Sequence, residues 1–141
     1  MKNFEFKSQV ATSVEQSKRL LELGLKKETA DCHWFYHNEH WEIKIGFDLM
    51  SCENLYPKYY IPAWSFGRLI KDLMPQSIEH LLELAVGSNY AGYYEDKCDS
   101  KLGMHWEYAE ETPDMFDNII STIEWLIKEG YFNKDYLEEK K

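Results

Sequence analysis

Hydrophobic and polar positions change their period several times along the chain, and each change predicts a new element. In residues 12–25, apolar side chains recur at the spacing of one helix face. Thr12 and Glu15, three residues apart, have the form of a capping box, and Gly24 is a typical helix stop. The pattern therefore predicts a helix over residues 13–23.

Residues 29–47 follow a period of two, which is typical of half-buried strands. Two alternating stretches are separated by the polar run at 37–40, where a turn is expected. The segment therefore predicts a hairpin with strands over 30–36 and 41–47.

Residues 61–75 place most of their large apolar side chains on one helix face and are bounded by Pro62 and Pro75. This arrangement predicts a short helix over residues 63–73. Gly67 inside it lowers helix propensity by about 1 kcal/mol relative to alanine, so packing must compensate.

Residues 77–96 admit two interpretations. The apolar positions between 78 and 85 fit a helix, whereas those before the Gly-Ser-Asn sequence fit a strand and a turn. The tyrosines that follow indicate a strand over 90–95, and the sequence MHWEY indicates another over 104–108.

The C-terminal helix has the clearest signals. Thr112 is a candidate cap, Pro113 suits the first helical position, and Asp114 complements the helix dipole. A broad apolar stripe follows and stops at Gly130. These signals predict a helix over residues 114–129.

The elements together predict a single α+β domain over residues 1–141. Its mainly antiparallel sheet would carry about three helices on one face. The chain is 44% hydrophobic, which suffices for a core without disulfides or a structural metal. Aromatic residues make up 16% of the chain, enough for a core with some aromatic surface left over.

Charge limits the classes of partner. The formal net charge is −9, and a general nucleic-acid binder needs a basic surface instead. Residues 93–117 carry eight acidic residues against Lys97 and Lys101. Such a segment attracts a basic partner or is simply a solvated face. No apolar run reaches the length of a membrane helix and no signal-peptide pattern is present, so a cytoplasmic protein without membrane contact is expected.

The sequence CHWFYHNEHWE, residues 32–42, is the densest group of potential metal ligands. His33, His37 and Glu42 would form the ligand face of a metal-dependent hydrolase. Metal sites require ligands that converge at about 2 Å, and this spacing carries no known metal motif. We therefore expect no metal and no cofactor here.

Three cysteines are present: Cys32, Cys52 and Cys98. They are far apart and form no C-x-x-C pair, so reduced and mostly buried thiols are expected. On a strand, Cys32 and His33 face opposite ways and cannot form a catalytic thiol–imidazole pair.

Aromatic and arginine side chains gather around one proline. Tyr59, Tyr60, Trp64 and Arg68 are of the residue types that dominate protein interfaces, and they are the predicted partner-binding residues. Trp64 and Arg68 are four apart and could stack on one helix face. The alternative interpretation is an aromatic corner of the core.

Three segments carry a resemblance to a known group of proteins. These are TSVEQSKRLLELGL with TADCHW, then IPAWSFGRLIKDLMP, and then DMFDNIISTIEWLIKEGYF. Together they resemble small uncharacterised proteins of phages, prophages and other mobile elements of gut Bacteroidetes. The resemblance implies a bacterial or viral cytoplasm and a helix–hairpin–helix–hairpin–helix order, which favours a strand over 81–86. It implies no activity, cofactor or site.

The leading hypothesis for function is a non-enzymatic accessory or interaction protein of a mobile element. It would bind another protein through its aromatic surface or through residues 93–117. A sharper version is an acidic inhibitor or nucleic-acid mimic aimed at a basic host protein. The alternative is the small metal-dependent hydrolase on the face of His33, His37 and Glu42. The oligomeric state does not follow from the sequence.

Overall fold

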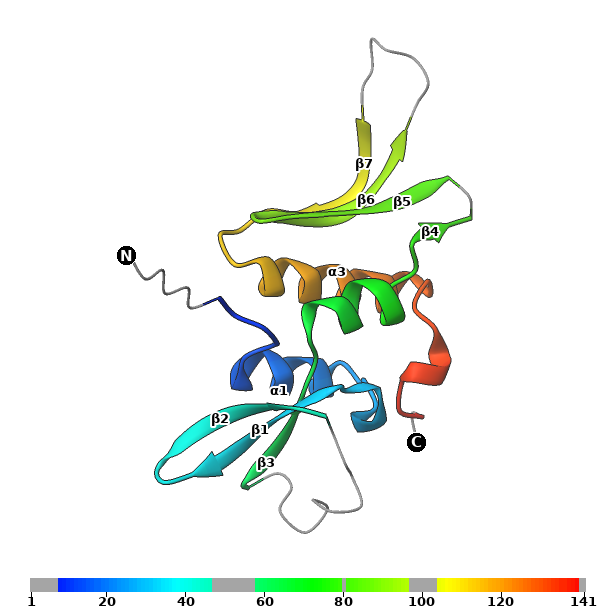
Figure 1. Ribbon diagram of the computed structural model, residues 1–141. Helices are drawn as coiled ribbons and strands as arrows, with labels where there is room; N and C mark the ends of the chain where they lie inside the picture. The colour runs from blue at the N-terminus through cyan, green and yellow to red at the C-terminus, as the bar shows by residue number, and fades with distance from the viewer. Residues whose placement is uncertain (1–7, 47–57, 80, 97–103, 140–141) are drawn as a thin grey trace, which may run out of the picture.

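Helices lie between two antiparallel sheets, one of three strands and one of four (Figure 1). The strand orders are β2-β1-β3 and β4-β5-β6-β7. The protein therefore has the α+β fold that the sequence predicts, with its strands divided between two sheets and helices covering one face of each. The computed structural model describes residues 8–46, 58–79, 81–96 and 104–139.

The predicted hairpin forms the larger part of the three-stranded sheet. Strand β1 (Cys32–His37) pairs with β2 (His40–Ile45) in antiparallel register. The two turn residues, Asn38 and Glu39, have φ angles of 50° and 66°. Two successive left-handed residues give the tight turn whose twist matches that of the flanking strands. The sequence prediction of this hairpin is confirmed, although Phe47 lies outside the described residues.

The third strand of this sheet, β3 (Tyr60–Ala63), was not predicted. We expected its last residue to begin a helix, but helical structure starts only at Phe66 and continues as the π-helix η3 (Arg68–Leu73). β3 is an edge strand, where the missing N–H of Pro62 is tolerated. The predicted helix over 63–73 is therefore correct from Phe66 onward, and wrong for its first three residues.

The four-stranded sheet follows the strand interpretation of the sequence. It consists of β4 (Ser77–Ile78), β5 (Leu82–Gly87), β6 (Tyr90–Asp96) and β7 (Met104–Glu110). The pairing of β6 with β7 shifts register between Tyr93 and Tyr94, and Glu107 is the extra residue opposite that step. This β-bulge interrupts the ladder of an edge strand.

Helix α1 (Val14–Glu22) has its capping box one residue later than predicted. Ser13 accepts a hydrogen bond from the backbone of Gln16, whose side chain accepts one from the backbone of Ser13. Thr12 is instead buried, and its hydroxyl accepts a 3.1 Å hydrogen bond from the backbone N–H of Trp64. Thr12 therefore ties α1 to the end of β3.

Helix α3 (Met115–Glu129) is capped by Asp114, which accepts a hydrogen bond from the backbone N–H of Asp117. The prediction that Thr112 caps the helix was wrong, because its hydroxyl bonds the buried side chain of Asn118 at 2.7 Å. Gly130, with φ of 79°, ends the helix as predicted.

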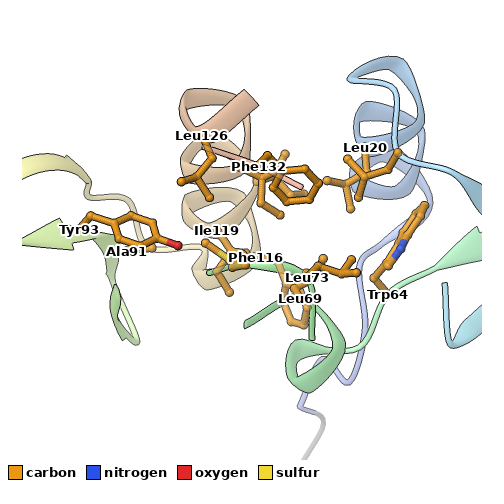
Figure 2. Close-up of a cluster of buried hydrophobic side chains, with 14 of the residues drawn as sticks. Leu20, Trp64, Leu69, Leu73, Ala91, Tyr93, Phe116, Ile119, Leu126 and Phe132 are labelled. Carbon is orange, nitrogen blue, oxygen red and sulfur yellow. The ribbon is translucent and has the colours of Figure 1, made fainter. Parts of the chain in front are cut away.

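The main core lies between α1, α3, η3 and the inner face of the four-stranded sheet (Figure 2). Tyr93 and Ala91 enter it from β6, and Leu20 enters it from α1. A smaller cluster lies on the three-stranded sheet and is made of Ala11, Cys32 and Ala63, with Trp34 and Ile43 packed against it.

The C-terminal segment returns to the end of α1. Two 3-10 turns, η1 (Lys27–Thr29) and η4 (Lys134–Tyr136), flank this contact. Leu25 and Leu137 form an isolated antiparallel bridge. The segment after α3 is thereby fixed to the first helix.

Candidate functional site

The predicted metal ligands each contact a different partner. His33 donates from Nδ1 to the carbonyl of Gly46 at 2.6 Å and stacks on the ring of Tyr60 at 4.3 Å between centroids. Glu42 binds His40, with 2.8 Å between Oε1 and Nε2. His37 lies at the turn, where its Nε2 accepts a hydrogen bond from Asn38.

Because of these contacts, the three predicted ligands do not converge on one point. Within the described ranges, no three His, Cys, Asp or Glu side chains are placed to hold a metal ion. The register explains the divergence, because His33 pairs with Lys44 and His37 pairs with His40 on the neighbouring strand. Glu42 lies opposite Phe35, between the two predicted histidine ligands.

Hydrogen bonds set the titration of the His40–Glu42 pair. Both ring nitrogens of His40 face acceptors, Glu42 at one side and the Asn38 carbonyl at the other. Because a neutral imidazole can donate only one hydrogen bond, this geometry favours the protonated ring. The hydrogen bond with Glu42, followed by that with Asn38, raises the pKa of His40, and the same pairing lowers the pKa of Glu42.

The predicted partner-binding residues divide into a buried pair and an accessible pair. Tyr60 is 2% exposed and Trp64 is 0% exposed, so neither belongs to an exposed aromatic surface. Tyr59 is 38% exposed, and the side chain of Arg68 is partly exposed. The alternative interpretation, an aromatic core corner, therefore holds for Tyr60 and Trp64.

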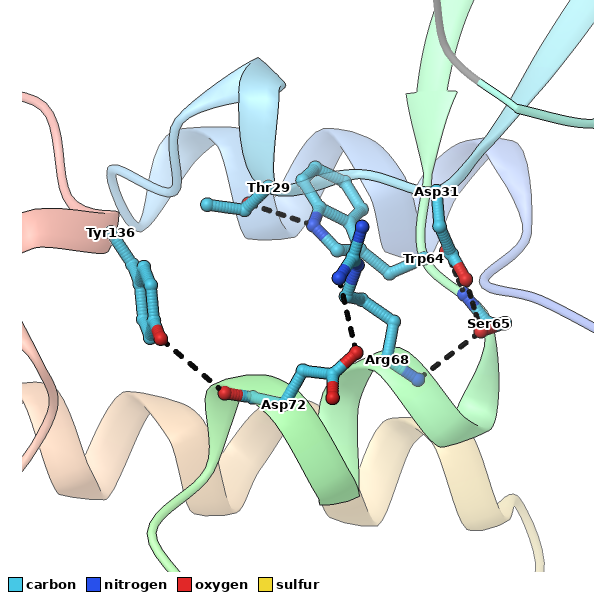
Figure 3. A network of polar contacts seen from close by, with 7 residues as sticks. All are labelled: Thr29, Asp31, Trp64, Ser65, Arg68, Asp72 and Tyr136. Carbon is cyan, nitrogen blue, oxygen red and sulfur yellow. Dashed lines mark hydrogen bonds and ion pairs between the residues drawn. The ribbon is translucent and has the colours of Figure 1, made fainter.

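Trp64 is anchored as a core residue. Its indole N–H donates to the hydroxyl of Thr29 at 2.9 Å, and it lies before the helix that carries Arg68 (Figure 3). The guanidinium of Arg68 pairs with Asp72, one turn further along η3, at 3.0 Å. The expectation that Trp64 shares a helix face with Arg68 was therefore wrong, because Trp64 precedes the helical residues.

Asp31 and Ser65 form a junction that the sequence reasoning missed. Asp31 accepts hydrogen bonds from the hydroxyl and the backbone N–H of Ser65, at 2.5 and 2.8 Å (Figure 3). The hydroxyl of Ser65 also accepts from the backbone N–H of Arg68, as a helix cap does. Serine is a preferred residue at the start of a helix, so Ser65, three residues before Arg68, was the signal in the sequence that could have identified this cap. These contacts commit the Ser65 hydroxyl to holding the helix start.

Cys32 lies next to this junction and is chemically quiet. It is a buried free thiol, in agreement with the sequence prediction, whereas Cys52 and Cys98 lie outside the described residues. Burial and the neighbouring Asp31 carboxylate raise the pKa of the Cys32 thiol to about 11. Because the thiolate is the nucleophilic form, this environment suits a structural cysteine.

The accessible aromatic residues gather at the distal end of the hairpin. We name Tyr36, Trp41 and Tyr59 the hairpin cluster. Tyr36 contacts Trp41 edge-on with centroids 5.2 Å apart, and it stacks with Tyr59 at 6.3 Å. The amino group of Lys58 lies 5.1 Å from the Tyr59 ring centroid.

The hairpin cluster occupies the same sheet face as buried residues nearer the body. Alternation places Tyr36 and Trp41 in phase with Trp34 and Ile43, which pack on the smaller core cluster. The indole of Trp34 donates to the carbonyl of Thr12 at 2.7 Å. The hairpin end, however, projects beyond α1 (Figure 1), so the core-facing side of the sheet becomes accessible there.

Comparisons with known proteins place the chain in no family. No family model matches the sequence, and neither a curated protein nor a solved structure is detectably similar to the chain. In the part of the chain that the structure describes, no helix combines the length and apolarity needed to cross a bilayer.

Proposed function

We propose that the protein is a non-enzymatic accessory protein of a phage or mobile element and binds a protein partner in the bacterial cytoplasm. The hairpin cluster is the binding surface. One observation carries the proposal: Tyr36 and Trp41 occupy core-facing strand positions where the helices no longer cover the sheet, and Tyr59, in the turn just before β3, stacks with Tyr36 (Figure 1). Tyr36 is 36% exposed and Tyr59 is 38% exposed.

The chemistry of these side chains suits protein recognition. Tyrosine and tryptophan provide large contact areas at little conformational cost, and both are enriched among residues that dominate binding energy. Ring contacts within the cluster hold the three side chains together before a partner arrives. Such preorganisation reduces the entropy lost on association.

The hydrolase alternative lacks comparable support. Its three residues are engaged in separate contacts: His33 with Gly46 and Tyr60, His37 with Asn38, and Glu42 with His40. Cys32 is held in the thiol form, and the Ser65 hydroxyl caps a helix. The contacts of these groups serve the fold.

The test compares capture of bacterial proteins by the intact chain and by a double variant, Tyr36→Thr with Trp41→Thr. Threonine retains strand propensity while removing both rings. A protein captured by the intact chain should then bind it when both are purified, and the double variant should bind at least about tenfold more weakly, as expected for loss of an interface centre.

A matched control removes an exposed apolar side chain outside the hairpin. Leu81 is exposed and precedes β5, so Leu81→Thr should bind the partner as the intact chain does. Circular dichroism should show that both variants remain folded. Equal binding by the double variant, or no partner captured by the intact chain even after cross-linking, would contradict the proposal.

A further inference from the structure

The outer face of the four-stranded sheet carries a second group of aromatic side chains. Tyr93 and Tyr108 pair across β6 and β7 and face α3, where both contact Trp125. Alternation places Tyr94 on the opposite face, and Trp106 is its partner on β7. Tyr90 lies on the same outer face, with its ring 5.9 Å from that of Trp106.

We name Tyr90, Tyr94 and Trp106 the aromatic row. The ring of Trp106 lies between the other two, because its centroid is also 5.8 Å from that of Tyr94. Tyr90 is 38% exposed, and the other two side chains are partly exposed. The row therefore presents ring surface to solvent from two adjacent strands.

The absence of a side chain at Gly87 makes room for the first ring of the row, Tyr90. Gly87 pairs with Tyr90 across β5 and β6, and a Cβ at Gly87 would lie 2.1 Å from the Tyr90 ring. The ring therefore occupies the space that a side chain at Gly87 would take. Tyr94 is held differently, because its hydroxyl donates to the carboxylate of Glu83 at 3.2 Å.

Among the described outward-facing strand positions, the charged side chains near the aromatic row are acidic. Glu83 faces outward on β5, where it pairs with Tyr94, and Glu107 is the exposed extra residue of the β7 bulge. Lysine, arginine and histidine are absent from the outward-facing strand positions among the described residues. Carboxylates beside exposed rings complement a ligand that is both cationic and planar.

Arginine is the side chain that matches both features. Its guanidinium stacks on aromatic rings and forms paired hydrogen bonds with a carboxylate, whereas a lysine ammonium is a strongly hydrated point charge. Nucleic acid could also stack on the rings, but the carboxylates would repel its phosphates. We propose that the outer face of the four-stranded sheet binds an arginine-containing basic segment of a protein. This surface is separate from the hairpin cluster, so the inference does not depend on the proposed function.

The test measures fluorescence anisotropy of a labelled arginine–glycine peptide with the full chain at low ionic strength. A lysine–glycine peptide of equal length and charge is the reference ligand. The arginine peptide should bind several-fold more tightly, because stacking and paired hydrogen bonds add to the charge attraction. Equal affinity for the two peptides would overturn the proposal, since it would indicate general attraction to an acidic protein.

Two variants of equal net charge locate the site. Glu83→Gln keeps an acceptor for Tyr94 but removes the carboxylate, and it should weaken arginine-peptide binding about tenfold, as loss of a charge-assisted hydrogen bond does. Glu15→Gln, on the exposed surface of α1, should change the affinity less than about twofold, because exposed charges at a distance are screened. Equal effects of the two variants would overturn the proposal.

A third variant tests the rings. Tyr90→Thr should lower the affinity for the arginine peptide more than the affinity for the lysine peptide. Tyr36→Thr, in the hairpin cluster, should leave both affinities unchanged. Binding of single-stranded DNA or an oligosaccharide at the aromatic row, without arginine-peptide binding, would overturn the proposed ligand class. Native fluorescence of Trp106 and the other tryptophans provides a check that each variant is folded.

Discussion

The two sheets use aromatic residues in opposite ways. In the four-stranded sheet, the face toward α3 is covered where Tyr93 meets Trp125, and the accessible rings lie on the other face. In the three-stranded sheet, accessible rings lie on the core-facing side itself, beyond the cover of α1 (Figure 1). Strand periodicity defines which residues share a face, but the position of the helices decides how far that face is buried.

The largest effect expected from this comparison is that of removing a fully buried ring in the four-stranded sheet. Tyr93 is buried, and its hydroxyl donates to the carbonyl of Pro75 at 2.6 Å. Tyr93→Ala should lower the free energy of unfolding by about 3–5 kcal/mol, as other large-to-small core changes do. Urea denaturation measures this loss. A loss below about 1 kcal/mol would mean that the four-stranded sheet is not held to α3 as described.

The second prediction concerns the junction between the three-stranded sheet and η3. Asp31→Asn keeps the shape of the side chain but replaces charge-assisted hydrogen bonds to Ser65 with neutral ones. We expect a loss of about 1–2 kcal/mol in the free energy of unfolding. Denaturation of Asp72→Asn, at an exposed ion pair, provides the comparison and should show a smaller change. The reverse order would contradict the assignment of Asp31 as the junction.

The third prediction concerns the same residue type as the first, at the uncovered end of the hairpin. Tyr36→Thr removes a ring that occupies a core-facing position but is 36% exposed. The loss in the free energy of unfolding should stay below about 1 kcal/mol, the scale of one cross-strand aromatic pair. A loss as large as that of Tyr93→Ala would show that the hairpin cluster is a core.

The smallest expected effect is in the pH dependence of the exposed hairpin face. The raised pKa of His40 and the lowered pKa of Glu42 confine the charged pair to a defined pH range. Its contribution is complete between the ordinary values of 4.5 and 6.5. It is lost as the pH rises through the raised pKa of His40, or falls through the lowered pKa of Glu42.

A titration followed by NMR measures this effect directly. The His40 ring should titrate above its ordinary pKa of 6.5, and Glu42→Gln should move the pKa of His40 downward. Glu39→Gln changes the charge of a turn residue without touching the pair, so it serves as the control. An unchanged His40 pKa in Glu42→Gln would remove the pair as its cause.

Local sequence signals predicted most of the elements because they depend on short-range preferences. The alternation in residues 29–47 and the apolar stripe before Gly130 sufficed for the hairpin and for α3. The division into two sheets could not be predicted in this way, because it depends on pairing between distant segments. β3 pairs with β1 across more than twenty residues. In addition, Pro62 made this segment resemble the start of a helix.

The candidate site was predicted less completely, and for a related reason. The prediction grouped Tyr59, Tyr60, Trp64 and Arg68 by residue type and by their proximity in the sequence. In the structure, however, Tyr60 and Trp64 are buried and the other two are at least partly exposed. Trp64 is buried in the main core, and Tyr60 is buried against His33 on the other face of the sheet. Tyr59, in the turn before β3, instead stacks with Tyr36. The sequence identifies residue types that commonly bind partners. Only the burial of each side chain in the folded protein shows which of them are accessible to a partner.

The β-bulge in β7 has a consequence for how the four-stranded sheet can associate. An uninterrupted edge strand offers its backbone to an incoming strand, which extends the sheet. The step at Tyr93 and Tyr94, with the acidic Glu107 inserted, breaks that row of backbone groups. Strand addition at β7 is therefore disfavoured, so a partner that approaches this edge of the sheet meets side chains before it meets backbone.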